Sequence, residues 1–240
     1  MYPEIAQLSY DRRTLRWDAW GGDGTDFAYP ELLPAIIKMV QAEIHASHLL
    51  SLPELQLEEL TVPVSRLRQT DLQMLQRITG TEGTRTDRQE RVLHSCGQSY
   101  YDVIRLKTNA LREFVDAVVY PQNEQQIVKI LQLAAKKKWA IIPFGGGTSV
   151  VGGVEALRQK QKASIALDLM RLNRVIDLST TDQLVRTQAG IYGPELEKEI
   201  QARGFTVSHF PQSFEYSTVG GWIAARGSGQ QSGKYGKIED

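Results

Sequence analysis

The sequence predicts an α/β protein: a helical N-terminal region, residues 1–95, followed by alternating strands and helices over residues 96–240. Apolar residues recur at helical spacing before about residue 95 and form short strand-like runs separated by helical stripes after it. The chain has 240 residues with 41% hydrophobic and 23% charged residues, which is typical of a globular protein with a sizeable core. A glycine-rich stretch, PFGGGTSV, directly follows one of the predicted strands.

In the N-terminal region two helices are predicted, over residues 31–44 and 65–78, separated by prolines. His45 and His48 lie near the end of the first helix, but no cysteine or carboxylate cluster completes a metal site. We therefore interpret both as solvated histidines and expect no metal. Residues 79–91 are rich in arginine, glycine, threonine and acidic residues, and we expect them to form a mobile polar connection.

From residue 96 onward the order of elements predicts a βαβ unit. The strand at 114–120 stops at Pro121, Asn123 caps a helix whose apolar stripe is Ile127, Ile130, Leu131 and Ala134, and the chain returns as a strand at 139–142. Further strands are predicted at 164–169, 174–178, 184–188 and 205–208, with helices from Gly193 to Gly204 and from an N-cap at Ser217 to Arg226.

The glycine stretch predicts a binding loop for an anion. Gly145 to Gly147 can adopt positive φ, and successive N–H groups in such a turn form a concave nest that suits a phosphate. The alternative is a glycine-rich surface turn between two strands. The stretch differs from the nicotinamide-dinucleotide fingerprint, which requires glycine where Val150 stands and a helix immediately afterwards.

The composition limits the classes of binding partner and the cellular compartment that we expect. Lys and Arg together number 28, as do Asp and Glu, so no overall field recruits nucleic acid. Cys96 is the single cysteine, which excludes an intrachain disulfide and fits a reducing compartment. No apolar run is long enough to span a bilayer, and the N-terminus lacks a secretory signal pattern. We expect a cytoplasmic protein, and leave peripheral membrane contact and a homodimer open.

Three stretches together resemble the flavin-binding half of the vanillyl-alcohol-oxidase (PCMH) type of FAD enzymes: PFGGGTSV, AGIYGPELEKEI at 189–200 and SHFPQSFEYSTVGGWIAARGSG at 208–229. Within that superfamily the chain is most similar to the alkyldihydroxyacetonephosphate synthase branch, through RWDAWG at 16–21, ALDLMRLNRVIDL at 166–178 and KYGKIED at 234–240. The resemblance implies that residues 96–240 form the first α+β subdomain of an FAD-binding domain that is incomplete at its C-terminus.

The resemblance also implies which residues hold FAD. The pyrophosphate would lie on the glycine loop, bound by backbone N–H groups and by the hydroxyls of Thr148 and Ser149. The cofactor-binding residues expected from the three motifs are Pro143, Phe144, Gly145, Gly146, Gly147, Thr148 and Ser149; Gln212, Ser213, Phe214, Glu215, Tyr216, Ser217 and Thr218; and Ala225, Arg226, Gly227 and Ser228. We expect Gly146→Val to abolish binding, on the premise that Gly146 has positive φ.

Two positions depart from the synthase pattern. Gln212 stands where the synthases usually have Asp, and Ala225 where they usually have Thr, so a charge and a hydroxyl are missing there. Covalent attachment in relatives often uses a histidine in the glycine loop; here Thr148 follows the glycines, so we expect non-covalent FAD. His209 is interpreted as a structural residue rather than a base.

For the synthases, the resemblance implies exchange of a fatty acid for a fatty alcohol through a flavin adduct, on a lipid-precursor substrate. The catalytic residues of that family lie in a C-terminal domain, and none of them has a counterpart before Asp240. We therefore name no catalytic residue and expect the chain to be a fragment that binds FAD weakly when isolated. The alternatives are an FAD-linked oxidase or dehydrogenase of a small 2-hydroxy acid, and a non-catalytic cofactor-binding piece.

Overall fold

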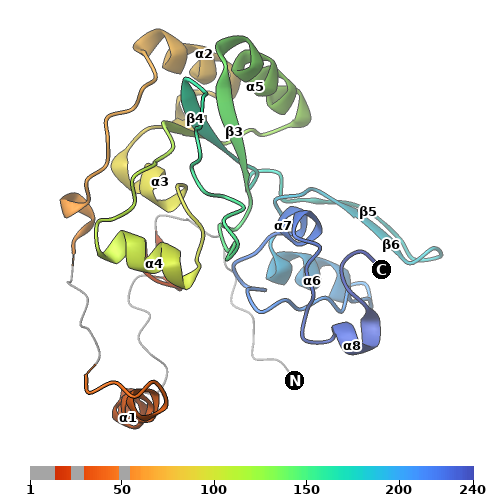
Figure 1. Cartoon of the computed structure of the whole chain (residues 1–240). Coiled ribbons are helices and arrows are strands. Elements are labelled where there is room, and N and C mark those ends of the chain that lie inside the picture. Colours follow the sequence, from red (N-terminus) through yellow and green to blue (C-terminus); the bar gives the residue numbers. More distant parts are fainter. Residues whose placement is uncertain (1–13, 23–29, 49–54) are drawn as a thin grey trace.

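A mixed four-stranded sheet forms the centre of the computed structural model, which describes residues 14–22, 30–48 and 55–240 (Figure 1). Its strand order is β1-β2-β4-β3. β4 (Ala163–Asp168) runs parallel to both β2 (Ala117–Val119) and β3 (Trp139–Phe144), and β1 (Thr84–Arg85) pairs with β2 in the antiparallel sense. Helix α5 (Glu124–Lys137) connects β2 to β3, with β4 between those two strands. The predicted α/β class and the parallel crossover are confirmed.

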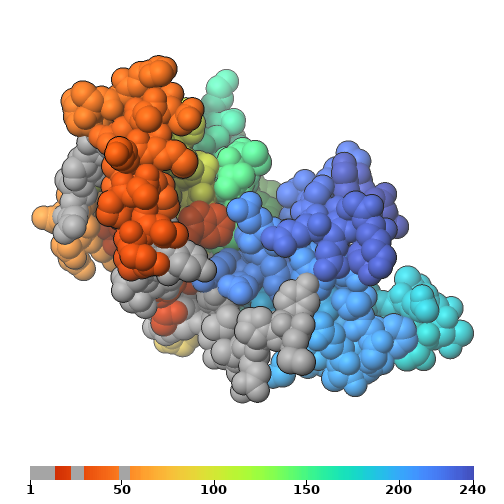
Figure 2. Space-filling model, turned by 90° about the horizontal axis from the view of Figure 1, so that it is seen from below, coloured from red at the N-terminus to blue at the C-terminus, as the bar shows by residue number. Residues whose placement is uncertain are grey.

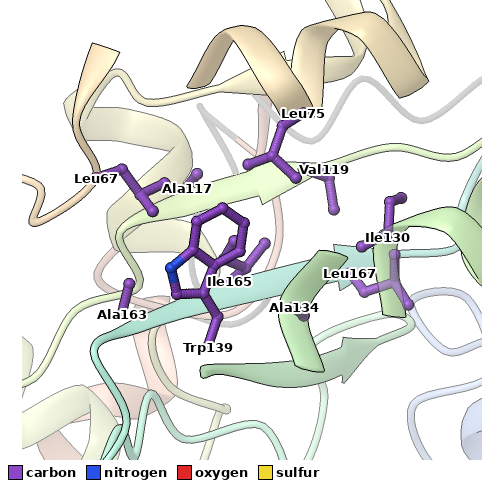
Figure 3. Packing of buried hydrophobic residues seen from close by; sticks show 10 residues of the cluster. All are labelled: Leu67, Leu75, Ala117, Val119, Ile130, Ala134, Trp139, Ala163, Ile165 and Leu167. Carbon is purple, nitrogen blue, oxygen red and sulfur yellow. The ribbon is translucent and has the colours of Figure 1, made fainter. Parts of the chain in front are cut away.

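One face of this sheet is covered by α5 and by α2 (Gln69–Thr79), as Figure 3 shows. Side chains of alternate strand residues point to this face, since successive residues of a strand face opposite sides. The buried cluster consists of Leu67, Leu75, Ala117, Val119, Ile130, Ala134, Trp139, Ala163, Ile165 and Leu167. An ion pair also joins the two helices: Lys137 Nζ donates to Asp71 Oδ1 at 2.7 Å.

On the opposite face α3 (Arg88–Leu93) lies against β2, and α4 (Tyr100–Lys107) follows α3 in the chain. The intervening strand residues, Val118, Ile142 and Ala166, point to this side and pack with Val115, Tyr120 and Ala156. Both helices have side-chain N-caps: Asp87 accepts from the Glu90 amide, and Ser99 accepts from the Asp102 amide. These helices lie beside the end of β3 from which the glycine loop begins (Figure 1).

The C-terminal part has its own core. The hairpin β5 (Val175–Ser179) and β6 (Leu184–Thr187) projects away from the main sheet (Figure 1). The buried cluster combines Ile191, Leu196 and Ile200 from in and around α6 (Gly193–Gln201) with Val219 and Trp222 of α7 (Val219–Ala224). The last helix is α8 (Ser232–Tyr235), and short 3-10 turns occur at η2 (Pro30–Leu32), η3 (Leu57–Glu59) and η4 (Thr81–Gly83).

Helix α1 (Leu33–Glu43) confirms the first predicted helix but buries none of its residues. Ile36 and Ile37, which the spacing places on an apolar stripe, are 36% and 37% exposed. In Figure 2 residues 30–48, coloured orange, stand at the surface on the side opposite the blue C-terminal residues. The separating residue Pro53 lies outside the described residues.

Most of the predicted elements are confirmed, with shifted ends. The helix predicted at 65–78 begins at Gln69, and Asn123 caps α5 by accepting from the Gln126 amide at 3.0 Å. The strands predicted at 164–169, 174–178 and 184–188 are β4, β5 and β6, and Gly204 follows α6 with φ of 81°. Leu131 is 45% exposed, so it does not belong to the buried stripe of α5; Leu133 packs on the core instead.

The expectation of a mobile connection over residues 79–91 is wrong. These residues form η4, β1 and part of α3, because their polar groups find partners within the fold. Thr79 and Thr84 share a buried hydroxyl contact of 2.8 Å, and Arg91 donates to the Val115 carbonyl at 2.7 Å. A polar composition therefore does not exclude ordered structure where each polar group has a partner.

Two further expectations are corrected near the C-terminus. Residues 205–208 form no strand; the Val207 amide donates to the buried Glu197 carboxylate at 2.9 Å instead of to a neighbouring strand. The N-cap of α7 is Thr218, whose hydroxyl accepts from the Gly221 amide, and not Ser217. The helix predicted there ends at Ala224, before Arg226.

The core of the main sheet gives a stability prediction. Ile130→Ala removes a fully buried side chain of α5 and should lower the free energy of unfolding by about 2–5 kcal/mol. Val128→Ala, on the exposed side of the same helix, should change it by no more than about 0.5 kcal/mol. Denaturant unfolding of the two variants measures both values, and equal effects would contradict the core assignment.

Candidate functional site

The glycine loop follows the carboxyl end of β3 and presents unused backbone donors. Among the described residues, the N–H groups of Gly146, Gly147, Thr148 and Ser149 donate to no acceptor. Consecutive free N–H groups of this kind form a partially positive concavity that suits an anion. This end of a parallel sheet is also where α/β folds bind their ligands. Among the described residues the loop therefore offers a set of donors of the kind that the sequence predicted, and the anion site itself stays a prediction.

Only one of the loop glycines, Gly147, has positive φ, at 74°. Gly146 is required for a different reason: a Cβ at this position would overlap the carbonyl oxygen of Tyr216 and lie 2.8 Å from its carbonyl carbon. A Cβ at Gly145 would likewise overlap Thr218 Oγ1. The premise of positive φ at Gly146 is wrong, and the close approach of residues 216–218 replaces it as the reason for glycine.

The structure thus brings two of the three expected cofactor segments together. Gly145 and Gly146 lie directly against residues 216–218, and Ser213 Oγ donates to Thr148 Oγ1 at 3.4 Å. The third segment, Ala225–Ser228, lies at the other end of α7, and no described contact joins it to the glycine loop. Within it Arg226 forms an ion pair with Glu239, and Ala225 and Ser228 are exposed.

Several hydroxyls of the expected site are already engaged. Ser149 Oγ accepts from the amides of Val151 and Gly153, at 3.4 and 3.0 Å, and so closes its own loop. Ser217 Oγ donates to the Ser213 carbonyl and accepts from Trp222 Nε1, both at 2.7 Å. Its single hydrogen is therefore used within the protein. The Thr218 hydroxyl is also engaged, because it caps the start of α7.

The remaining residues of the expected site differ in environment. Phe144 is buried beneath the loop, and Pro143 beside it is exposed. Phe214 stacks on Trp222 with ring centroids 6.0 Å apart, so it belongs to the C-terminal core. Tyr216 meets the ring of Trp20 edge to face at 6.2 Å. Gln212 and Glu215 are exposed, and no hydrogen bond of their side chains occurs among the described residues.

A buried polar network beneath the loop was not found from the sequence. His94 is fully buried, and its ring lies 4.4 Å from the ring of Phe144. Its Nδ1 donates to the Glu90 carbonyl at 2.7 Å, and its Nε2 lies 2.9 Å from Asp168 Oδ2. Because Nδ1 already carries a hydrogen, a second proton must lie between Nε2 and Asp168. Tyr120 donates to Glu90 Oε2 at 2.6 Å and completes the network.

His209 and Cys96 are two further buried side chains of types that can act in catalysis. Burial lowers the pKa of His209, whose Nε2 has no partner among the described residues and whose ring packs 5.1 Å from that of Trp222. Burial raises the pKa of the Cys96 thiol to about 12, so it is not a nucleophile near neutral pH. In the described ranges no group of His, Cys, Asp or Glu side chains is arranged to hold a metal ion.

These features define a domain with an anion-binding type of loop, and comparison with known proteins identifies it as a flavin-binding domain. Residues 115–240 match the family described as "FAD binding domain", and the chain belongs to this family of FAD-dependent enzymes. FAD is therefore its cofactor. The uncommitted N–H groups of the loop, with glycines that leave space beside them, fit a cofactor carrying a pyrophosphate.

The chain is similar to alkyldihydroxyacetonephosphate synthases. It is 32% identical over 251 residues to the one from Trypanosoma brucei brucei, covering 94% of this chain and 40% of that protein. A solved structure of alkyldihydroxyacetonephosphate synthase matches with a TM-score of 0.81 and 30% identity, over 95% of this chain and 46% of that one. The D-2-hydroxyglutarate dehydrogenase of Escherichia coli (strain K12) is 32% identical over 148 residues, covering 59% of this chain and 14% of that protein. The chain thus spans less than half the length of these relatives.

The close approach at Gly146 gives a prediction that needs no cofactor. Gly146→Ala should force residues 145–147 and 216–218 apart and lower the free energy of unfolding by about 1–3 kcal/mol. Gly233→Ala is the matched control, because a Cβ there meets nothing within 4 Å. Thermal or denaturant unfolding compares the two, and an unaffected Gly146→Ala variant would show that the segments are not in contact.

His209 gives a pH prediction. Because burial lowers its pKa in the folded state, the unfolded chain takes up the proton first as pH falls below its ordinary value of about 6.5. Stability should therefore fall as the pH drops from neutral through about 6.5, and His209→Gln should reduce this slope. Unfolding curves across this range measure it; identical slopes for the wild type and His209→Gln would contradict the burial of a neutral ring.

Proposed function

We propose that the glycine loop and residues 212–218 hold the FAD of this domain. The pyrophosphate would lie on the N–H groups of residues 146–149, with the Thr148 hydroxyl beside them. The observation that carries the proposal is that these donors are uncommitted while the loop is held against Tyr216 and Thr218. Anions are stabilised by such preformed donors because no reorganisation is needed on binding.

The other expected residues take supporting roles in this proposal. Phe144 anchors the loop from below, and Ser217 and Phe214 join residues 212–218 to Trp222 of α7. Ala225, Arg226, Gly227 and Ser228 would contact the cofactor at the far end of α7. FAD would be bound without a covalent link, since no histidine stands in the glycine loop. We also propose that the chain divides at residue 95 into an N-terminal region, which contributes β1 to the sheet, and the FAD-binding domain of residues 96–240.

For the whole protein we propose alkyldihydroxyacetonephosphate synthase activity on a small lipid-precursor substrate. The similarity over 94–95% of this chain to such synthases supports this choice over a hydroxy-acid dehydrogenase, whose similarity covers 59%. When bound, the flavin would supply the reactive ring for the exchange of acyl and alkyl groups. We further propose a cytoplasmic protein with peripheral membrane contact, acting as a homodimer. None of the helices in the described ranges has the length and apolar character needed to cross a bilayer.

FAD binding is tested on a longer version of the protein, which is purified, incubated with FAD, freed of the excess and examined for flavin absorbance. We expect retained oxidised-flavin absorbance in the wild type and in Gly233→Ala, and loss of it in Gly146→Ala, whose added Cβ displaces Tyr216 from the loop. A wild-type protein that stays colourless at high FAD concentration would contradict the proposed site.

The two candidate reactions differ in electron balance, which a longer version of the protein can reveal. Exchange of a fatty acid for a fatty alcohol has no net redox change, so the absorbance of oxidised flavin should not be lost on anaerobic addition of a 2-hydroxy acid. Dehydrogenation of that acid would instead bleach the flavin absorbance. Bleaching by D-2-hydroxyglutarate would therefore favour the dehydrogenase.

A further inference from the structure

The turn at residues 94–98 contacts the glycine loop at both of its ends. At the start of the loop, the His94 ring lies 4.4 Å from the ring of Phe144. At its end, the Gln98 amide donates to the Ser149 carbonyl at 2.8 Å, and a Cβ at Gly97 would overlap that same carbonyl oxygen. This turn precedes the matched family domain, which begins at residue 115.

The loop needs contacts from other segments because its own residues make few interactions that fix its conformation. Glycines lose more conformational freedom on ordering than other residues. The N–H groups proposed to bind the pyrophosphate cannot fix the loop before the ligand arrives, since they donate to no acceptor among the described residues. Contacts through the carbonyl of Ser149 and the ring of Phe144 therefore leave the donors free while holding both ends of the loop.

The turn is itself rigidly held. Ser95 Oγ donates to the Arg91 carbonyl at 2.5 Å and accepts from the Val115 amide at 3.0 Å, while its carbonyl accepts from the Ala156 amide at 2.9 Å. His94 is fixed on two sides, by the Glu90 carbonyl and by Asp168. Asp168 in turn accepts from the Met170 amide at 2.8 Å, at the carboxyl end of β4 beside Phe144.

We propose that residues 94–98, through His94 and Gly97, are a positioning element that holds the glycine loop in its FAD-binding conformation. His94 and Gly97 are positioning residues, because they act through Phe144 and Ser149 and not on the cofactor itself. The proposal rests on the proposed FAD site. It extends the cofactor-binding machinery to a segment on the N-terminal side of the family domain.

The test compares FAD affinity with stability in four variants. Gly97→Ala should weaken FAD binding by at least about tenfold, because the added Cβ pushes Ser149 away. His94→Gln, which keeps a polar group facing Asp168 but loses the ring on Phe144, should weaken it in the same direction. Ile130→Ala, destabilised in the distant core, and Gly233→Ala should bind FAD as the wild type does. Fluorescence titration with FAD and thermal unfolding are measured on each.

Hydrogen exchange in the absence of FAD separates this inference from the proposed function. In Gly97→Ala the amides of Gly153 and Leu169, which donate to Ser149 Oγ and to the Phe144 carbonyl, should exchange faster than in Ile130→Ala of equal or lower stability. Unchanged exchange there overturns the positioning role, even if the wild type binds no FAD. Wild-type FAD affinity in both Gly97→Ala and His94→Gln, or an equal loss in Ile130→Ala, also overturns it.

Discussion

The carbonyl group of Tyr216 occupies the space that any side chain at position 146 would need, and the main sheet meets the C-terminal part of the chain at this contact. On one side lies β3 with the main sheet, and on the other α7 with the C-terminal cluster. The same short segment is held from behind, because Ser217 O accepts from the Gly193 amide and Thr218 bridges to Tyr192. The starts of α6 and α7 and the end of β3 are thereby fixed relative to one another.

This arrangement separates the groups that build the loop from those that face a ligand. The carbonyl of Phe144 is used by Leu169, the carbonyl of Ser149 by Gln98, and the hydroxyl of Ser149 by Val151 and Gly153. The N–H groups of Gly146, Gly147, Thr148 and Ser149 donate to no acceptor within the part of the chain that the structure describes. An anion that binds them replaces water without disturbing the packing that shaped the loop, so little binding energy is lost to reorganisation.

Local signals explain what could be predicted from the sequence. Asn123 before an amphipathic stretch, the short apolar run at β4 and the glycines after β3 act over a few residues, and each predicted its element. The wrong predictions concern segments whose conformation depends on residues far away in the sequence. Residues 79–91 are ordered by partners such as Val115 and by pairing of β1 with β2, and Ser217 loses its capping role because Trp222 and Ser213 use its hydroxyl. His94 and Asp168 are 74 positions apart, and no short-range pattern could join them.

The buried network shows why the support of the loop is polar rather than apolar. Tyr120, Phe144 and Asp168 follow or end three neighbouring parallel strands, so their side chains gather at one edge of the sheet. Asp168 must have a partner there, because a buried carboxylate left unpaired costs several kcal/mol, about 3–5 when one member of such a pair is removed. His94 supplies that partner, and its hydrogen bonds on opposite ring nitrogens fix the ring plane in a way that an apolar side chain would not. The His94 ring, held in this way by Glu90 and Asp168, is the surface on which Phe144 packs at the start of the glycine loop.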